Sequence, residues 1–230
     1  MEIVVDNKHI FYDQLGLGSK DIVMLHGWGQ NMEMMRPLAI KLLNDKNIKN
    51  NYRITILDLP GFGSSSEPDM DTDVFSYTKL IENFLIALKI NNPIMLGHSF
   101  GGRLSIIYSS RNETEKVILF GAPCIREYKP TFKEKVLKGL KKIPFTKDLV
   151  ELAKQYIGST DYKNASPVMR TVLVNTINQD LSECAKKITA PTLLIWGSLD
   201  TAAPIEQARK LEKLLKDGAL IEIPGATHYA

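Results

Sequence analysis

Short apolar runs recur along the chain and alternate with segments whose apolar residues follow helical spacing. At the N-terminus, residues 3–5 and 10–12 flank a polar turn at 6–8 and predict an antiparallel hairpin. Further apolar runs predict strands at 21–25, 52–57, 93–96, 116–120, 192–196 and 220–223. Helical spacing predicts helices at 32–43, 77–88, 103–108 and 205–215. Strands that alternate with helices in this way indicate a largely parallel sheet covered on both faces.

One long interval interrupts the alternation. Between Phe120 and Thr192 lie about seventy residues without a convincing strand pattern, and connections of this length are commonly insertions with a role of their own. Apolar residues recur there at helical spacing, at Phe132, Val136, Leu137, Leu140, Ile143, Leu149, Leu152, Ala153 and Tyr156. We therefore predict a helical cap at residues 125–187, inserted into a core formed by 1–124 and 188–230. Its first half is rich in lysine. This composition occurs both in membrane-binding helices and in cap helices whose lysines face water. We favour the solvated face and expect no membrane contact.

Glycine-rich and polar motifs follow four of the predicted strands. In a parallel α/β sheet, functional residues collect where strands end. The four motifs are His26-Gly27-Trp28-Gly29, Asp58-Leu59-Pro60-Gly61-Phe62-Gly63-Ser64-Ser65, Leu96-Gly97-His98-Ser99-Phe100-Gly101-Gly102 and Trp196-Gly197-Ser198-Leu199-Asp200. Their shared position predicts one functional edge of the sheet.

Ser99 lies in a Gly-x-Ser-x-Gly pattern between a predicted strand and a predicted helix, which is typical of a nucleophile elbow. Such a turn lifts one hydroxyl above the strand ends. Gly97 and Gly101 leave room for it, because a Cβ at either position would strike the neighbouring backbone. A serine hydroxyl is a poor nucleophile at neutral pH, so it needs a base within reach and a third group that orients the base.

His228 is the best candidate for that base. It follows the last predicted strand, whereas His9 lies in the N-terminal hairpin and His26 and His98 lie inside tight motifs. Because His228 must be neutral to accept a proton, we expect activity to fall on acidification through the usual titration range of histidine, about pH 6.5.

Asp200 is the candidate for the orienting acid, since it follows a strand and gives the chain order Ser99, Asp200, His228. It is also placed as a turn or N-cap residue ahead of the helix predicted at 205–215; the two roles are compatible, and we favour the orienting acid. Asp58 also ends a strand, but we interpret it as a brace for its own loop.

Acyl transfer also requires donors for a developing oxyanion. The backbone N–H of Phe100 follows the nucleophile, and the loop after an earlier strand offers the backbone N–H of Trp28. Gly27 would let this loop turn its amides inward. We expect His26, Gly27 and Trp28 to line the substrate pocket.

Composition narrows the functional class. The chain has 230 residues, 44% of them hydrophobic and 24% charged, and a formal net charge of +3, which is too small to indicate nucleic-acid binding. Its two cysteines, Cys124 and Cys184, are far apart and form no CxxC motif, as expected for a reduced protein. The N-terminus lacks a signal-peptide pattern, and no apolar run approaches the roughly 18 residues of a membrane span. We expect a cytoplasmic protein, either a monomer or a weak dimer.

Together with Gly225-Ala226-Thr227-His228, the four motifs resemble those of α/β-hydrolase fold enzymes of the capped, serine-nucleophile kind. The resemblance runs from the third strand to the C-terminus and implies about eight mostly parallel strands flanked by helices. Haloalkane dehalogenases and epoxide hydrolases are similar but place aspartate at the nucleophile position, so Ser99 argues against both. Such proteins usually continue past the histidine into a terminal helix, whereas this sequence ends at Tyr229-Ala230.

We therefore expect a serine hydrolase that cleaves a small or medium ester-like acyl substrate through an acyl-enzyme intermediate. Its catalytic residues would be Ser99, Asp200 and His228, and no metal or organic cofactor is implied. Two alternatives use the same residues: hydrolysis of a C–C bond or lactone by the same triad, and a ligand-binding protein that keeps the fold with little turnover.

Overall fold

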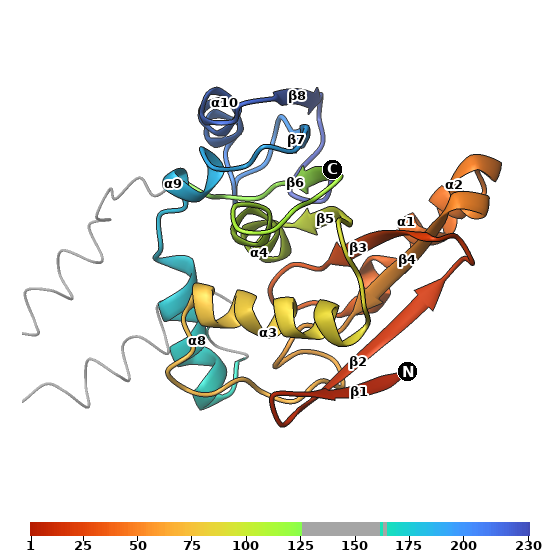
Figure 1. The fold of residues 1–230 in the computed structure, drawn as a ribbon. Coiled ribbons are helices and arrows are strands. Elements are labelled where there is room, and N and C mark those ends of the chain that lie inside the picture. The colour runs from red at the N-terminus through yellow and green to blue at the C-terminus, as the bar shows by residue number, and fades with distance from the viewer. Residues whose placement is uncertain (126–161, 163–164) are drawn as a thin grey trace, which may run out of the picture.

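An eight-stranded sheet forms the centre of the molecule in the computed structural model, which describes residues 1–125, 162 and 165–230 (Figure 1). Its strands are β1 (Glu2–Val5), β2 (Lys8–Leu15), β3 (Lys20–Leu25), β4 (Tyr52–Leu57), β5 (Ile94–His98), β6 (Lys116–Phe120), β7 (Thr192–Gly197) and β8 (Gly218–Ile223). Their order is β1-β2-β4-β3-β5-β6-β7-β8. The pairs β1–β2 and β2–β4 are antiparallel, and all other neighbours are parallel. This confirms the predicted, mostly parallel α/β-hydrolase sheet.

Helices cover both faces of the sheet and form two apolar clusters. The helices of the described residues are η1 (Met32–Met34), α1 (Arg36–Leu43), α2 (Lys46–Asn51), α3 (Val74–Ala87), α4 (Phe100–Ser109), α8 (Pro167–Ile177), α9 (Ser182–Ala185) and α10 (Ile205–Leu214). Along β3, Val23 and Leu25 pack in the larger cluster with α3, α4 and α10, while Ile22 and Met24 pack in the smaller one with α1. Strand side chains alternate between faces, so a buried parallel strand must be apolar on both.

The helix α3 shows how the sequence specifies these elements. Asp73 precedes it and accepts a hydrogen bond from the backbone N–H of Ser76, which caps the helix at 2.7 Å. Tyr77, Ile81 and Phe84 then recur at helical spacing and are almost completely buried. One helix face therefore packs against α4 and covers the sheet at β1 and β2, where the ring of Phe84 meets that of Tyr12.

The predicted helix at 32–43 forms as two pieces, η1 and α1. The pattern did not predict α2, a short and largely polar helix that Asp45 caps through the N–H groups of Asn47 and Ile48. Its few residues lack an apolar stripe, so hydrophobic periodicity gives no signal for it.

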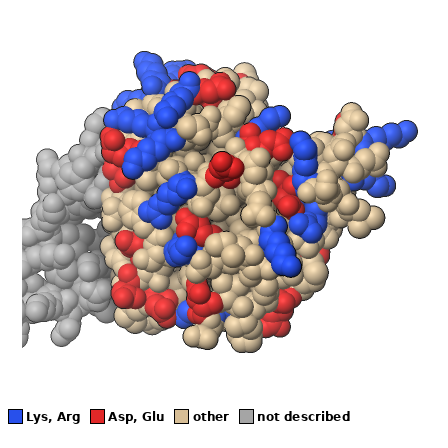
Figure 2. All heavy atoms as spheres, in the orientation of Figure 1, with Lys and Arg blue, Asp and Glu red and all other residues tan. Residues whose placement is uncertain are grey.

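Within the predicted cap, α8 and α9 are helical as expected, and most of the remaining cap, including its lysine-rich first half, lies outside the described residues. The division into core and cap therefore stays a prediction. Acidic and basic side chains are interspersed over the face shown in Figure 2, in keeping with the small net charge. None of the helices that the structure describes is both long and apolar enough to cross a bilayer. Cys124 and Cys184 are free thiols.

Candidate active site

Ser99 occupies a strained turn between β5 and α4. Its φ is 50°, in the left-handed region that residues with a Cβ rarely adopt, and its backbone N–H donates to the carbonyl oxygen of Phe120 at 2.8 Å. A Cβ on Gly97 would lie 2.5 Å from the carbonyl oxygen of Gly101, and one on Gly101 would lie 2.2 Å from that of Leu25. Both contacts are with backbone, so glycine is required at both positions, as the sequence predicted.

Asp200 and His228 meet above the ends of β7 and β8. The Nδ1 of His228 lies 2.7 Å from Oδ2 of Asp200. The other carboxylate oxygen accepts hydrogen bonds from the backbone N–H groups of Ala202 at 2.9 Å and Ala203 at 2.8 Å. Asp200 therefore has both roles considered for it, as a turn residue and as the partner of His228. A carboxylate only accepts, so Nδ1 must carry a hydrogen, and in the neutral form of the ring the lone pair is then on Nε2.

The segment after β6 connects this pair to Ser99. Phe120 binds the backbone of Ser99, and the next residue, Gly121, lies against the Asp200–His228 pair. A Cβ on Gly121 would lie 3.0 Å from Nδ1 of His228 and 3.1 Å from Oδ2 of Asp200. The three predicted catalytic residues therefore converge on one edge from β5, β7 and β8.

The two residues whose backbone N–H groups are the predicted oxyanion donors, Trp28 and Phe100, are neighbours. The backbone N–H of Gly101 donates to the carbonyl oxygen of His26 at 3.1 Å, which joins the start of α4 to the loop after β3. The rings of Trp28 and Phe100 meet edge to face at 5.1 Å. Phe100 is the first residue of α4, so its backbone N–H has no carbonyl within the helix to bind.

His26 is placed differently from the expectation that it lines the substrate pocket. It is completely buried, its Nδ1–H donates to the carbonyl oxygen of Gly27 at 2.7 Å, and its Nε2 accepts from the backbone N–H of Leu59 at 3.0 Å. Burial lowers the pKa of His26 to about 4, so the ring is neutral. This histidine therefore links the loop after β3 to the loop after β4. Both of its ring nitrogens are hydrogen-bonded, so neither can bind a substrate.

Asp58 braces the second of these loops, as interpreted from the sequence. Its Oδ1 accepts from the backbone N–H of Met32 at 2.9 Å, and its Oδ2 accepts from that of Ser64 at 2.8 Å. A Cβ on Gly63 would overlap this carboxylate, since it would lie 2.1 Å from Oδ2. The loops after β3 and β4 therefore hold one another in place.

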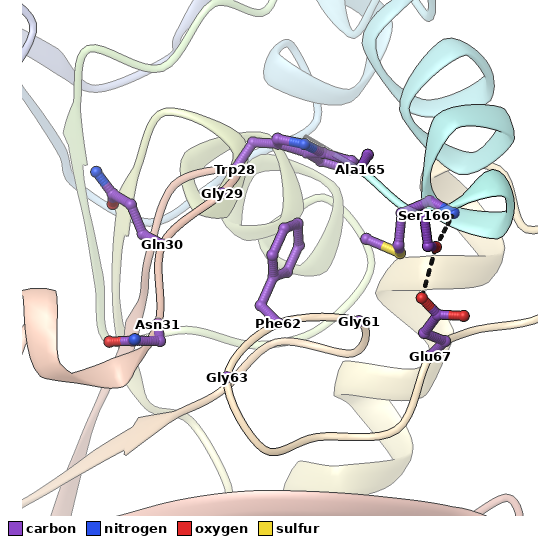
Figure 3. Close-up of a pocket in the computed structure, with 11 residues that line it drawn as sticks. Trp28, Gly29, Gln30, Asn31, Gly61, Phe62, Gly63, Glu67, Ala165 and Ser166 are labelled. Carbon is purple, nitrogen blue, oxygen red and sulfur yellow. Dashed lines mark hydrogen bonds between the residues drawn. The ribbon is translucent and has the colours of Figure 1, made fainter. Parts of the chain in front are cut away.

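A cavity of about 360 Å³ lies between these loops and the start of α8 (Figure 3). It is lined by Trp28, Gly29, Gln30, Asn31, Gly61, Phe62, Gly63, Glu67, Ala165, Ser166 and Met169. Trp28 and Phe62 meet edge to face at 4.9 Å in its wall, and Ser166 donates from its hydroxyl to Glu67 at 2.6 Å. Of the three residues predicted to line a substrate pocket, Trp28 does line this cavity, while His26 and Gly27 do not belong to its described lining.

Sequence reasoning missed the contact of His98. This histidine is almost completely buried, and its Nε2 lies 2.9 Å from the backbone carbonyl oxygen of His228. The two residues are 130 positions apart, so no local pattern could reveal the contact. Within the described ranges, no group of three histidine, cysteine or acidic side chains could hold a metal ion.

Comparison with known proteins identifies related chains. The family model described as alpha/beta hydrolase fold matches residues 21–150. An AB hydrolase superfamily protein of Bacillus subtilis, YisY, is 26% identical over 249 residues, which cover 96% of this chain and 89% of that protein. The pimeloyl-[acyl-carrier protein] methyl ester esterase of Pectobacterium atrosepticum is 25% identical over 246 residues, covering 95% and 91%. The structure of an esterase from Exiguobacterium antarcticum matches with a TM-score of 0.74 at 24% identity, covering 99% and 92%.

Proposed function

Since this chain belongs to the α/β-hydrolase-fold family, we propose that it is a serine hydrolase that cleaves a small or medium ester-like acyl substrate. The observation that carries the proposal is the convergence of three groups at one sheet edge. Ser99 lies on a strained turn, and the Asp200–His228 pair, joined at 2.7 Å, packs against the segment that binds the backbone of Ser99. A nucleophile beside an oriented base is the arrangement that acyl transfer uses.

The proposed reaction has two halves. His228 takes the hydroxyl proton of Ser99 through Nε2 while Ser99 Oγ attacks the substrate carbonyl, and the N–H groups of Trp28 and Phe100 stabilise the resulting oxyanion. The protonated imidazole then gives its proton to the leaving alcohol as the C–O bond breaks, which leaves an acyl-enzyme. Water, activated by the same imidazole, releases the acid and restores Ser99. Asp200 holds the tautomer of His228 throughout.

Two observations support an ester as the substrate and a pocket of modest size. Relatives that align over most of this chain include a methyl ester esterase. Trp28, the proposed oxyanion donor, also lines the cavity of about 360 Å³, which supports this cavity as the substrate-binding volume. We propose that residues 125–187 cap this side of a core formed by 1–124 and 188–230, with α8 supplying part of the wall.

The direct test replaces the nucleophile. We expect S99A to stay folded and to lose p-nitrophenyl acetate turnover by about 10³-fold or more, because the reaction loses its attacking atom. A fluorophosphonate probe should label the wild-type protein at Ser99 and leave S99A unlabelled.

The matched control is S64A, since Ser64 is an exposed serine in the neighbouring loop. It should keep both turnover and labelling. Turnover that survives in S99A would refute the proposal. Binding of an ester by the wild-type protein without labelling would instead assign it to the ligand-binding class.

A further inference from the structure

His98 lies one residue before Ser99, and its ring faces the segment that carries His228. Its Nε2 is 2.9 Å from the backbone carbonyl oxygen of His228, while its ring stacks on Tyr229 with centroids 5.4 Å apart. A carbonyl oxygen only accepts, so the hydrogen of His98 must be on Nε2. The contact therefore fixes one tautomer.

The other ring nitrogen of His98, Nδ1, carries no hydrogen in this tautomer. It is buried and has no hydrogen-bond partner in the described part of the chain, and it lies so close to Gly27 that a Cβ there would approach it to 2.8 Å. In the neutral ring this atom bears only a lone pair. Protonation would bury an N–H without an acceptor, and the pKa of His98 is accordingly lowered by burial.

Neutrality matters here because of the neighbouring rings. His98 and His228 have centroids 4.9 Å apart, and the charged group facing this pair is the carboxylate of Asp200, which binds His228. The proposed reaction makes His228 an imidazolium. A second positive ring at this distance would oppose that charge, whereas a neutral His98 does not.

We propose that His98 is a positioning residue, which holds the main chain of His228 so that its imidazole stays within reach of Ser99. This inference rests on the proposed function. His228 then has two attachments, Asp200 at ring Nδ1 and His98 at the backbone carbonyl. Because His98 and Ser99 are consecutive, the nucleophile and the attachment of its base belong to the same rigid strand end.

The test compares three variants at this position. In H98Q the side-chain amide reaches about as far as Nε2 and can still donate to the carbonyl. H98N is too short to reach it, and H98F fills the space without a donor. We expect H98F and H98N to lower kcat for p-nitrophenyl acetate by about 10- to 100-fold with KM nearly unchanged, because small displacements of a catalytic group cost rates of this order. H98Q should recover most of the loss.

A second measurement separates positioning from general damage. In an H228A background the base is gone, so H98F should add little further loss, and the two losses should not add. Thermal melting of each variant shows whether it is folded, and if H98F does not fold, the H98Q–H98N comparison decides the question.

Wild-type kcat in H98F or H98N would overturn the inference, as would a loss of equal size in the H228A background. Persistent turnover in S99A would instead overturn the proposed function itself, so the two failures are distinguishable.

Discussion

The buried ring of His26 should make the stability of this protein sensitive to acid. Both of its nitrogens are committed, one to the carbonyl of Gly27 and one to the N–H of Leu59, and the second contact requires an unprotonated Nε2. Desolvation is the main reason that the pKa falls from 6.5 to about 4. In the unfolded chain the same ring titrates near its ordinary value.

The sign and size of the effect follow from this difference. Between pH 6.5 and about 4 the unfolded state binds the proton and the folded state does not, so acid favours unfolding. The stability contributed by neutral His26 is complete above pH 6.5 and is lost as the pH falls toward 4. A difference of about 2.5 units at 1.36 kcal/mol per unit corresponds to about 3 kcal/mol. This is a large part of a typical stability of 5–15 kcal/mol.

Urea unfolding at pH 7, 5.5 and 4 measures the loss, and H26Q supplies the control. The glutamine oxygen can accept the hydrogen bond of Leu59 but cannot be protonated in this range. Other groups, including His98, contribute equally to both proteins, so the difference between their pH slopes isolates His26. We expect the wild-type protein to lose about 3 kcal/mol more than H26Q between pH 7 and 4. Equal slopes would refute the reasoning.

Two further substitutions test the site and the elbow. D200N should keep the fold and lower kcat for p-nitrophenyl acetate by about 10⁴-fold, because an amide no longer enforces the Nδ1–H tautomer of His228. A kcat close to that of the wild type would exclude Asp200 as the orienting acid. G101A should prevent folding or strongly lower Tm, since its Cβ meets backbone at 2.2 Å. G225A is the matched control: its Cβ meets nothing within 4 Å, so only the strain of φ 75° remains, about 1–2 kcal/mol. Comparable melting of the two variants would contradict the clash.

The sequence predicted the sheet and the convergence of its motifs because both depend on local patterns. Apolar runs such as 116–120 are buried strands whichever partners they find, and a parallel sheet brings their ends to one edge. The need for glycine at 97 and 101 was predictable for the same reason, because the turn that they allow is formed within five consecutive residues. Local signals therefore located the candidate nucleophile.

The roles of His26 and His98 beside the site could not be predicted from the sequence, because they depend on contacts between distant segments. His26 has the residue type and position of a pocket residue. It is instead a buried link between two loops, because the backbone N–H of Leu59 donates to its Nε2. His98 occupies a position of the Gly-x-Ser-x-Gly motif that any residue can fill. Its role follows only from its contact with the distant segment that carries His228. Both rings are neutral, but they use their nitrogens differently. His26 donates from one nitrogen and accepts at the other, whereas His98 donates from Nε2 and buries an Nδ1 that carries no hydrogen.

The geometry of the site depends in turn on strand register. His98 pairs with Phe120 and Phe120 with Ile195, so β5 and β6 end at the same level. Beyond that level β7 and β8 stay paired as far as Gly197 and Ile223, so the segments that carry Asp200 and His228 leave the sheet together. A slip of one residue would shift a strand end by about 3.3 Å and send its side chains to the opposite face. Such a shift exceeds the length of the hydrogen bond between His98 and His228. Because β5 is apolar and buried on both faces, each slip would also exchange its two core surfaces. The packing that stabilises the sheet is therefore also what keeps the proposed nucleophile, acid and base in register.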